Sequence, residues 1–180
     1  MEFLTPAECE EFFVRVGFDA EAVMNLRRVD KKHAANFHYQ SRLGPMKRTC
    51  ELIATKFPSY TTALFWTSCS PWGDGVSSED DPYRARSEWQ QITAFRKARG
   101  ETRRLYDAPG HLFGTAERDA IALFAEVAIG IGWDSVLAAR PNKTVIYFSH
   151  DDIVQVQSDK NLSEISEQMT KLGFKRGEFC

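Results

Sequence analysis

The residue types best suited to chemistry gather in Ser149-His150-Asp151-Asp152, at the end of a β-rich segment. If the strand continued, His150 and Asp152 would project to the same side, at a separation that a divalent metal ion could bridge. His111 is a candidate second imidazole. A serine, a histidine and an aspartate that are neighbours in sequence do not form a triad, however, because triad geometry is assembled in space. Adjacent aspartates are also ordinary turn residues. The sequence therefore assigns no catalytic residue and keeps His150, Asp152 and His111 as candidates.

A second group of candidates lies in residues 68–82, which are rich in glycine and serine and end in acidic residues. Loops of this length inside a compact domain are uncommon and are usually functional or disordered. A tryptophan in such a loop has little core around it and suits a binding contact. The acidic residues lack the alternating pattern of a calcium loop, and nothing beside Cys69 would lower its pKa. Trp72, Asp80 and Asp81 are therefore expected to bind a partner, and neither a metal nor a cofactor is indicated.

Charge is segregated along the chain, although the formal net charge is only −2. Residues 27–48 hold seven arginines and lysines against one aspartate, and residues 84–104 hold seven against two glutamates. Such segregation can steer association with a charged partner, and it also suits the solvated outer face of a helix. In the first segment, Arg27, Arg28, Lys31 and Lys32 are candidate binding residues. Phe37, His38 and Tyr39 could stack on exposed bases, so nucleic-acid binding stays an alternative.

The elements that must position these side chains are clearest between residues 115 and 157. Apolar residues at helical spacing predict a long buried helix near 116–130, with Thr115 as its N-cap and glycines at its end. Residues 136–139 and 144–150 read as strands around a four-residue turn, and residues 153–157 as a third strand. We expect a three-stranded antiparallel meander with the long helix packed across it.

The remaining segments complete an α+β prediction. Thr5-Pro6-Ala7-Glu8 combines a capping box with proline at the first helical position, and Gly17 ends that helix. Residues 60–67 favour a strand, and residues 163–172 a last helix that stops at Gly173. The sequence predicts a single domain over residues 1–180, with a small, mostly antiparallel sheet of about four strands packed against several helices.

Composition indicates an ordinary soluble protein. The four cysteines are widely scattered, without a C-x-x-C pair, and no signal peptide is evident at the first residues. A reducing cytoplasm is the expected location. No apolar run approaches the roughly 20 residues that a membrane span requires, so no membrane association is expected.

No sequence motif with a known mechanism accompanies these features, so function rests on the charge pattern. We expect a non-catalytic cytoplasmic protein-binding module, for instance an inhibitor or immunity-type protein that masks a target surface. One alternative is a hydrolase using His150 and Asp152, with or without a divalent metal. The other is a nucleic-acid-binding domain that uses the basic segments 27–48 and 84–104. An enzyme requires His111 or another base near His150 in a concave pocket, whereas a binding module tolerates histidines that lie apart.

Overall fold

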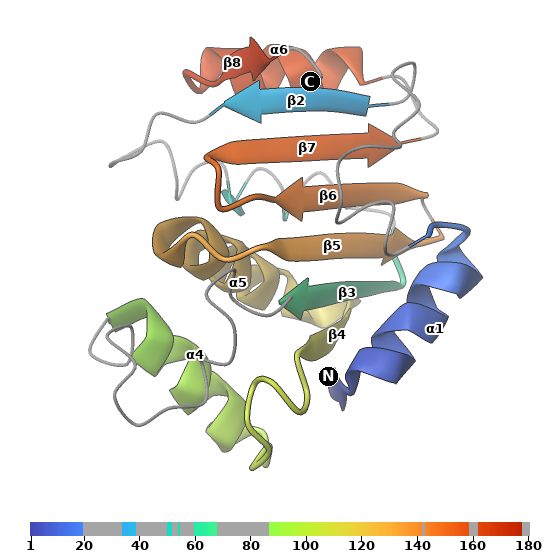
Figure 1. Ribbon diagram of the computed structural model, residues 1–180, viewed down its shortest axis with the longest axis vertical. Helices are drawn as coiled ribbons and strands as arrows, with labels where there is room; N and C mark the ends of the chain where they lie inside the picture. Colours follow the sequence, from blue (N-terminus) through green and yellow to red (C-terminus); the bar gives the residue numbers. More distant parts are fainter. Residues whose placement is uncertain are drawn as a thin grey trace.

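The computed structural model describes residues 1–19, 34–38, 50–51, 54, 60–67, 87–141, 143–158 and 162–177. Within these ranges, four α-helices flank one antiparallel sheet of eight strands (Figure 1). The strands are β1 (Glu2–Leu4), β2 (Ala34–His38), β3 (Thr62–Thr67), β4 (Gly110–Gly114), β5 (Ser135–Arg140), β6 (Thr144–Phe148), β7 (Ile153–Ser158) and β8 (Lys175–Gly177). The helices are α1 (Pro6–Val16), α4 (Ser87–Ala98), α5 (Arg118–Ile131) and α6 (Ser163–Lys171), with a 3-10 turn, η3 (Thr115–Glu117), before α5.

The sheet is twice as wide as the sequence predicts. Its strand order is β1-β4-β3-β5-β6-β7-β2-β8. The meander β5-β6-β7 and strand β3 are confirmed, but the prediction of about four strands is wrong. The strands that were missed, β1, β2, β4 and β8, have only three to five residues each. Segments this short have little local signal, and they become strands because a neighbouring strand supplies their hydrogen bonds.

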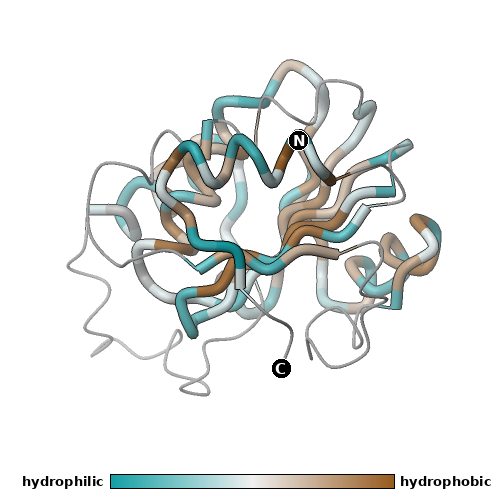
Figure 2. Tube along the Cα trace, turned by 90° about the horizontal axis from the view of Figure 1, so that it is seen from above, coloured by the Kyte–Doolittle hydropathy of each residue, from teal (hydrophilic) through white to brown (hydrophobic). Residues whose placement is uncertain are grey.

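Side chains alternate along the strands and build a separate core on each face of the sheet. Leu64, Trp66 and Tyr147 pack on one face, where α1 covers them with Phe12 and Phe13. The other face carries a larger cluster, which includes Phe37, Phe65, Phe113, Leu137, Phe148 and Val156 from the sheet, with Ile121 and Phe124 from α5 and Met169 from α6. Seen from above, the sheet separates α1 from the helices of the larger core (Figure 2).

Local signals set most of the helix ends. Thr5 and Glu8 form the predicted capping box, and Gly17 adopts the left-handed conformation at φ 85° that ends α1. The prediction of Thr115 as an N-cap is wrong, because Thr115 lies inside η3. Instead, the Glu117 carboxylate accepts the backbone N–H of Gly114 at 2.9 Å. The predicted long buried helix is confirmed as α5, which packs against β3, β4 and β6 and carries α4 on its outer side.

None of the helices in the described ranges has the length and apolar character needed to cross a membrane.

Candidate functional site

His150 is the second residue after β6 and is held by Asp134, the residue before β5. Its Nδ1 is 2.9 Å and 3.0 Å from the two carboxylate oxygens of Asp134, and its backbone N–H donates to the same carboxylate. The pairing of Ser135 with Phe148 in the antiparallel register brings the two residues together. The hydrogen bond to Asp134 raises the pKa of His150 above its ordinary value, because it favours the charged imidazolium.

The surroundings of His150 do not form a triad. The buried hydroxyl of Ser149 accepts the backbone N–H of Asp151 at 3.1 Å, so it serves the turn. Strand β6 ends at Phe148, and therefore the alternation that would place His150 and Asp152 on one side does not continue. Asp152 instead adopts a φ of 61° in the turn before β7. Across the described ranges, no group of three or more histidine, cysteine, aspartate or glutamate side chains could hold a metal ion.

His111 is fully buried on β4 and is bound by Arg96 of α4. The Arg96 Nη1 lies 2.6 Å from the His111 Nε2. Because a guanidinium only donates, the imidazole accepts through Nε2 and carries its proton on Nδ1. Burial, aided by the charge of Arg96, lowers the pKa of His111 to about 3. At neutral pH this histidine is uncharged and its acceptor nitrogen is occupied, so it is not available as a base.

Arg96 also fixes the loop that follows α4. Its Nη1 donates to the Ala108 carbonyl at 2.8 Å, and its Nη2 donates to the carbonyls of Arg103 and Arg104 at 3.1 Å and 3.4 Å. Beside it, the buried Glu101 carboxylate accepts the Arg103 backbone N–H at 2.8 Å and pairs with the Arg103 guanidinium. The hydrogen bonds from Arg103 hold the pKa of Glu101 below its ordinary value. The loop is thus fastened from inside by buried charged groups.

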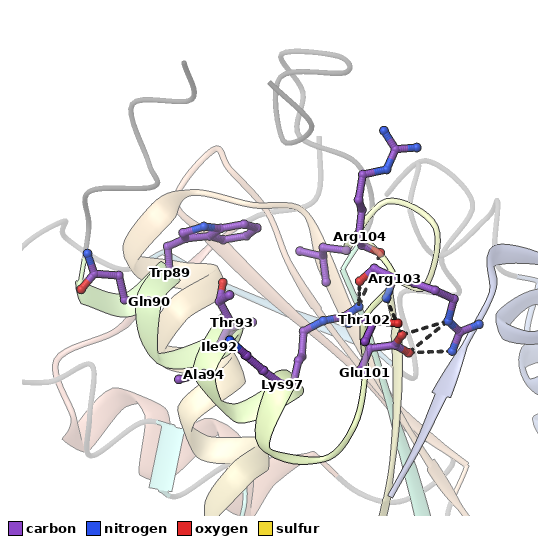
Figure 3. Close-up of a pocket in the computed structure, with 12 residues that line it drawn as sticks. Trp89, Gln90, Ile92, Thr93, Ala94, Lys97, Glu101, Thr102, Arg103 and Arg104 are labelled. Carbon is purple, nitrogen blue, oxygen red and sulfur yellow. Dashed lines mark hydrogen bonds and ion pairs between the residues drawn. The ribbon is translucent and has the colours of Figure 1, made fainter. Parts of the chain in front are cut away.

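A pocket of about 790 Å³ lies between α4 and this loop (Figure 3). We call it the basic hollow; its lining residues are Trp89, Gln90, Ile92, Thr93, Ala94, Arg96, Lys97, Glu101, Thr102, Arg103, Arg104 and Leu105. The lining surface is mostly apolar. Trp89 and Lys97 line it from α4, and Arg104 stands out from the loop (Figure 3). The Trp89 ring makes an edge-to-face contact with Trp133, at a ring-centroid distance of 5.2 Å.

The two histidines do not converge. His111 lies on β4 and His150 follows β6, with β3 and β5 between those two strands. At an interstrand spacing of about 4.8 Å, three intervals separate them by about 14 Å across the sheet. Neither histidine lines the basic hollow.

All seven of the predicted binding residues lie outside the described residues. These are Arg27, Arg28, Lys31, Lys32, Trp72, Asp80 and Asp81, together with Cys69, Tyr39 and all of the loop 68–82. Of the first basic segment, only residues 34–38 are described, and they form β2. Phe37 is fully buried there, which corrects the prediction that it could stack on exposed bases.

Sequence reasoning missed Asp134 and the basic hollow. Extending the register of the predicted hairpin by two residues places Asp134 opposite Ser149, next to His150, so the sequence contained a signal for this contact. For the hollow, the signal was the position of Arg96, which falls at helical spacing from Trp89 and Ile92 and therefore on the buried side of α4.

Comparison of the chain with protein-family models, with curated proteins and with solved structures gave no match.

Proposed function

We propose that this chain is a non-catalytic cytoplasmic module that binds another protein, in the manner of inhibitors and immunity proteins that mask a target surface. The basic hollow carries the proposal. It joins an apolar floor of Trp89, Ile92 and Leu105 to the cationic side chains of Lys97 and Arg104. Tryptophan and arginine dominate the energetics of protein interfaces, and a central apolar pocket with a polar rim is the usual interface design.

The placement of the histidines supports binding over catalysis. A hydrolytic site needs a base beside the reacting atoms on the floor of a pocket. His111 is buried and neutral, with its acceptor nitrogen used by Arg96, and His150 lies several strands away.

The cytoplasmic part of the proposal is supported by the described cysteines. Cys9 and Cys50 are both free and buried. Burial raises the pKa of Cys9 to about 12, so its thiol stays protonated and unreactive at neutral pH. Unpaired, inert thiols suit a reducing compartment.

A capture experiment followed by titration tests the proposal. The immobilised chain is exposed to a lysate of its source cells at low salt, beside an unrelated immobilised protein of the same net charge. We expect a protein that only this chain retains, and that forms a stoichiometric complex with it when purified and titrated calorimetrically. If no retained protein forms such a complex, the proposal fails.

A second candidate function rests on the contact between His150 and Asp134. An aspartate that holds the Nδ1 of a histidine directs Nε2 to act as a base, the arrangement that hydrolases use. In this chain that Nε2 lies 3.4 Å from the Asp151 carboxylate, so a substrate would have to displace Asp151. Under this candidate, His150 would activate water at the open end of β6. Hydrolysis of nitrophenyl acetate or of bis-nitrophenyl phosphate, with and without Mg²⁺ or Mn²⁺, tests it. Activity that disappears in both His150→Ala and Asp134→Asn would support the hydrolase, and inactivity with every substrate would remove it.

A further inference from the structure

The basic hollow combines three properties that together specify a ligand. Its lining is mostly apolar, its cationic side chains outnumber its one acidic side chain, and hydrogen bonds from Arg96 hold its loop side. At about 790 Å³ it falls within the range of about 300–1,000 Å³ that is usual for ligand pockets.

The floor is suited to one large apolar side chain. Trp89 and Ile92 come from α4 and Leu105 from the opposing loop, so the apolar surface is two-sided. The contact with Trp133 holds the Trp89 ring, which limits the conformational entropy that binding would remove. An aromatic side chain inserted between these residues would gain burial and edge-to-face or stacked contacts.

The charges at the rim are suited to carboxylates. Lys97 lines the hollow from α4, and its ammonium forms no ion pair with the described residues. The Arg104 guanidinium, with a side-chain exposure of 63%, pairs with the Asp107 carboxylate through Nε at 2.8 Å and Nη2 at 3.1 Å, so its charge is already partly neutralised. The acidic residue of the lining, Glu101, is buried and already neutralised by Arg103. A partner segment therefore meets net positive charge, and acidic residues beside its apolar anchor would be attracted.

The hollow is preorganised by Arg96. Its hydrogen bonds to the carbonyls of Ala108, Arg103 and Arg104 hold the loop at a set distance from α4. Binding a partner therefore does not have to order this loop. Because that entropy cost is absent, more of the free energy of the contacts contributes to affinity.

We propose that the basic hollow receives an acidic segment of the partner protein, with one aromatic side chain of that segment seated on Trp89, Ile92 and Leu105 and its carboxylates facing Lys97 and Arg104. This rests on the proposed protein-binding function and identifies the chemistry of the partner. A peptide that lies across the hollow satisfies the apolar floor and the charged rim together.

The test uses fluorescein-labelled peptides that probe the hollow directly. The first alternates aspartate and glutamate around a central phenylalanine. The second has serine in place of the phenylalanine, the third has lysines in place of the acidic residues, and oligouridylate RNA is the fourth probe. By fluorescence anisotropy we expect the first peptide to bind, the second to bind about tenfold more weakly, and the third not to bind. Affinity should fall as salt is raised, because the rim charges are exposed.

Matched variants locate the binding site. The double variant Lys97→Glu with Arg104→Glu should weaken binding of the first peptide at least about tenfold. The double variant Lys171→Glu with Arg15→Glu changes the net charge equally, on exposed faces of α6 and α1, and should bind as the wild type does. Thr93→Trp, at an exposed lining position, should block the hollow without altering the core.

The possible results distinguish a failure of this inference from a failure of the proposed protein-binding function. The inference is overturned if the first peptide does not bind, or if the serine peptide binds as tightly as the first peptide. It is also overturned if the RNA binds more tightly than the first peptide, or if the variant Lys97→Glu with Arg104→Glu binds the first peptide with unchanged affinity. If the captured protein partner still binds the rim variants and Thr93→Trp with wild-type affinity, the inference fails while the binding function stands. If the peptide binds as expected but no partner protein is found, the function fails and the ligand chemistry of the hollow remains.

Discussion

Arg96 is the residue on which most of the local structure depends. It is buried and charged, and burial lowers its pKa only to about 10, so it stays protonated at neutral pH. We expect Arg96→Met to lower the free energy of unfolding by about 3 kcal/mol, because the substitution leaves the His111 nitrogen and several carbonyls without donors. Arg96→Lys should lower it by about 2 kcal/mol, since an ammonium cannot replace the guanidinium fork. Urea unfolding measures both. Losses below about 0.5 kcal/mol would show that these hydrogen bonds are not structural.

His111 makes the free energy of unfolding fall as the pH is lowered. Its folded pKa is depressed to about 3, whereas in the unfolded chain it takes up a proton near pH 6.5. The unfolded state binds more protons between these values, so stability falls as pH is lowered. At pH 5, above the ordinary pKa of the carboxylates, the contribution of His111 to the loss relative to pH 8 should be about 2 kcal/mol, and His150 offsets part of it. Urea unfolding at the two pH values checks this. His111→Gln should remove most of the difference, and an equally steep dependence in that variant would contradict the assignment.

The contribution of His150 to stability changes with pH in the opposite direction to that of His111. Its folded pKa is raised by Asp134, so its contribution to stability is complete below the unfolded pKa of about 6.5 and is lost as pH rises through the folded pKa. An NMR titration should show the His150 ring titrating above pH 6.5 in the wild type and at a lower pH in Asp134→Asn. The His111 ring should show no titration in that window in either protein. An unchanged His150 titration in the variant would disprove the coupling.

At the scale of elements, β4 packs closely against its neighbours β1 and α1. A Cβ on Gly110 would lie 2.9 Å from the Leu4 Cβ and nearer still to the Cys9 Sγ. Gly110→Ala should therefore reduce the free energy of unfolding by about 2–3 kcal/mol, because three elements would have to shift.

Gly130 provides the matched control, since it lies within α5 and a Cβ there would meet nothing within 4 Å. Gly130→Ala should stabilise by about 0.5–1 kcal/mol, through the better helix propensity of alanine. Thermal and urea unfolding report both changes. A loss of similar size in the two variants would mean that the effect at Gly110 is conformational and not steric.

The sequence predicts the elements that carry their own signals and misses those that depend on distant partners. The capping box of α1, the hairpin turn between β5 and β6 and the glycine stop of α6 are local, and each was predictable. Strand β2 pairs with β7 and β8, more than 100 residues away along the chain, so nothing within Ala34–His38 predicts it. The basic hollow could not be predicted from the sequence either. Its shape depends on contacts between Arg96 and carbonyls of a loop without regular structure.

For the whole molecule, the strand order implies a gradient of local stability. Strands β5 and β6 lie in the interior of the sheet with pairing partners on both sides, whereas β1 and β8 are three-residue edge strands. Local opening is easiest where few contacts must break. Amide hydrogen exchange should therefore be slowest in β5 and β6 and fastest in β1 and β8. Edge amides as protected as those of β5 would contradict this gradient.

The same strand order places the first and last strands on opposite edges. With a spacing of about 4.8 Å between strands, β1 and β8 stand roughly 30 Å apart across the sheet. A circularly permuted version of this protein would need a linker long enough to cross that distance. A donor fluorophore at Glu2 and an acceptor at Lys175 would likewise act as a molecular ruler, since every strand between them must stay paired for the transfer efficiency to hold.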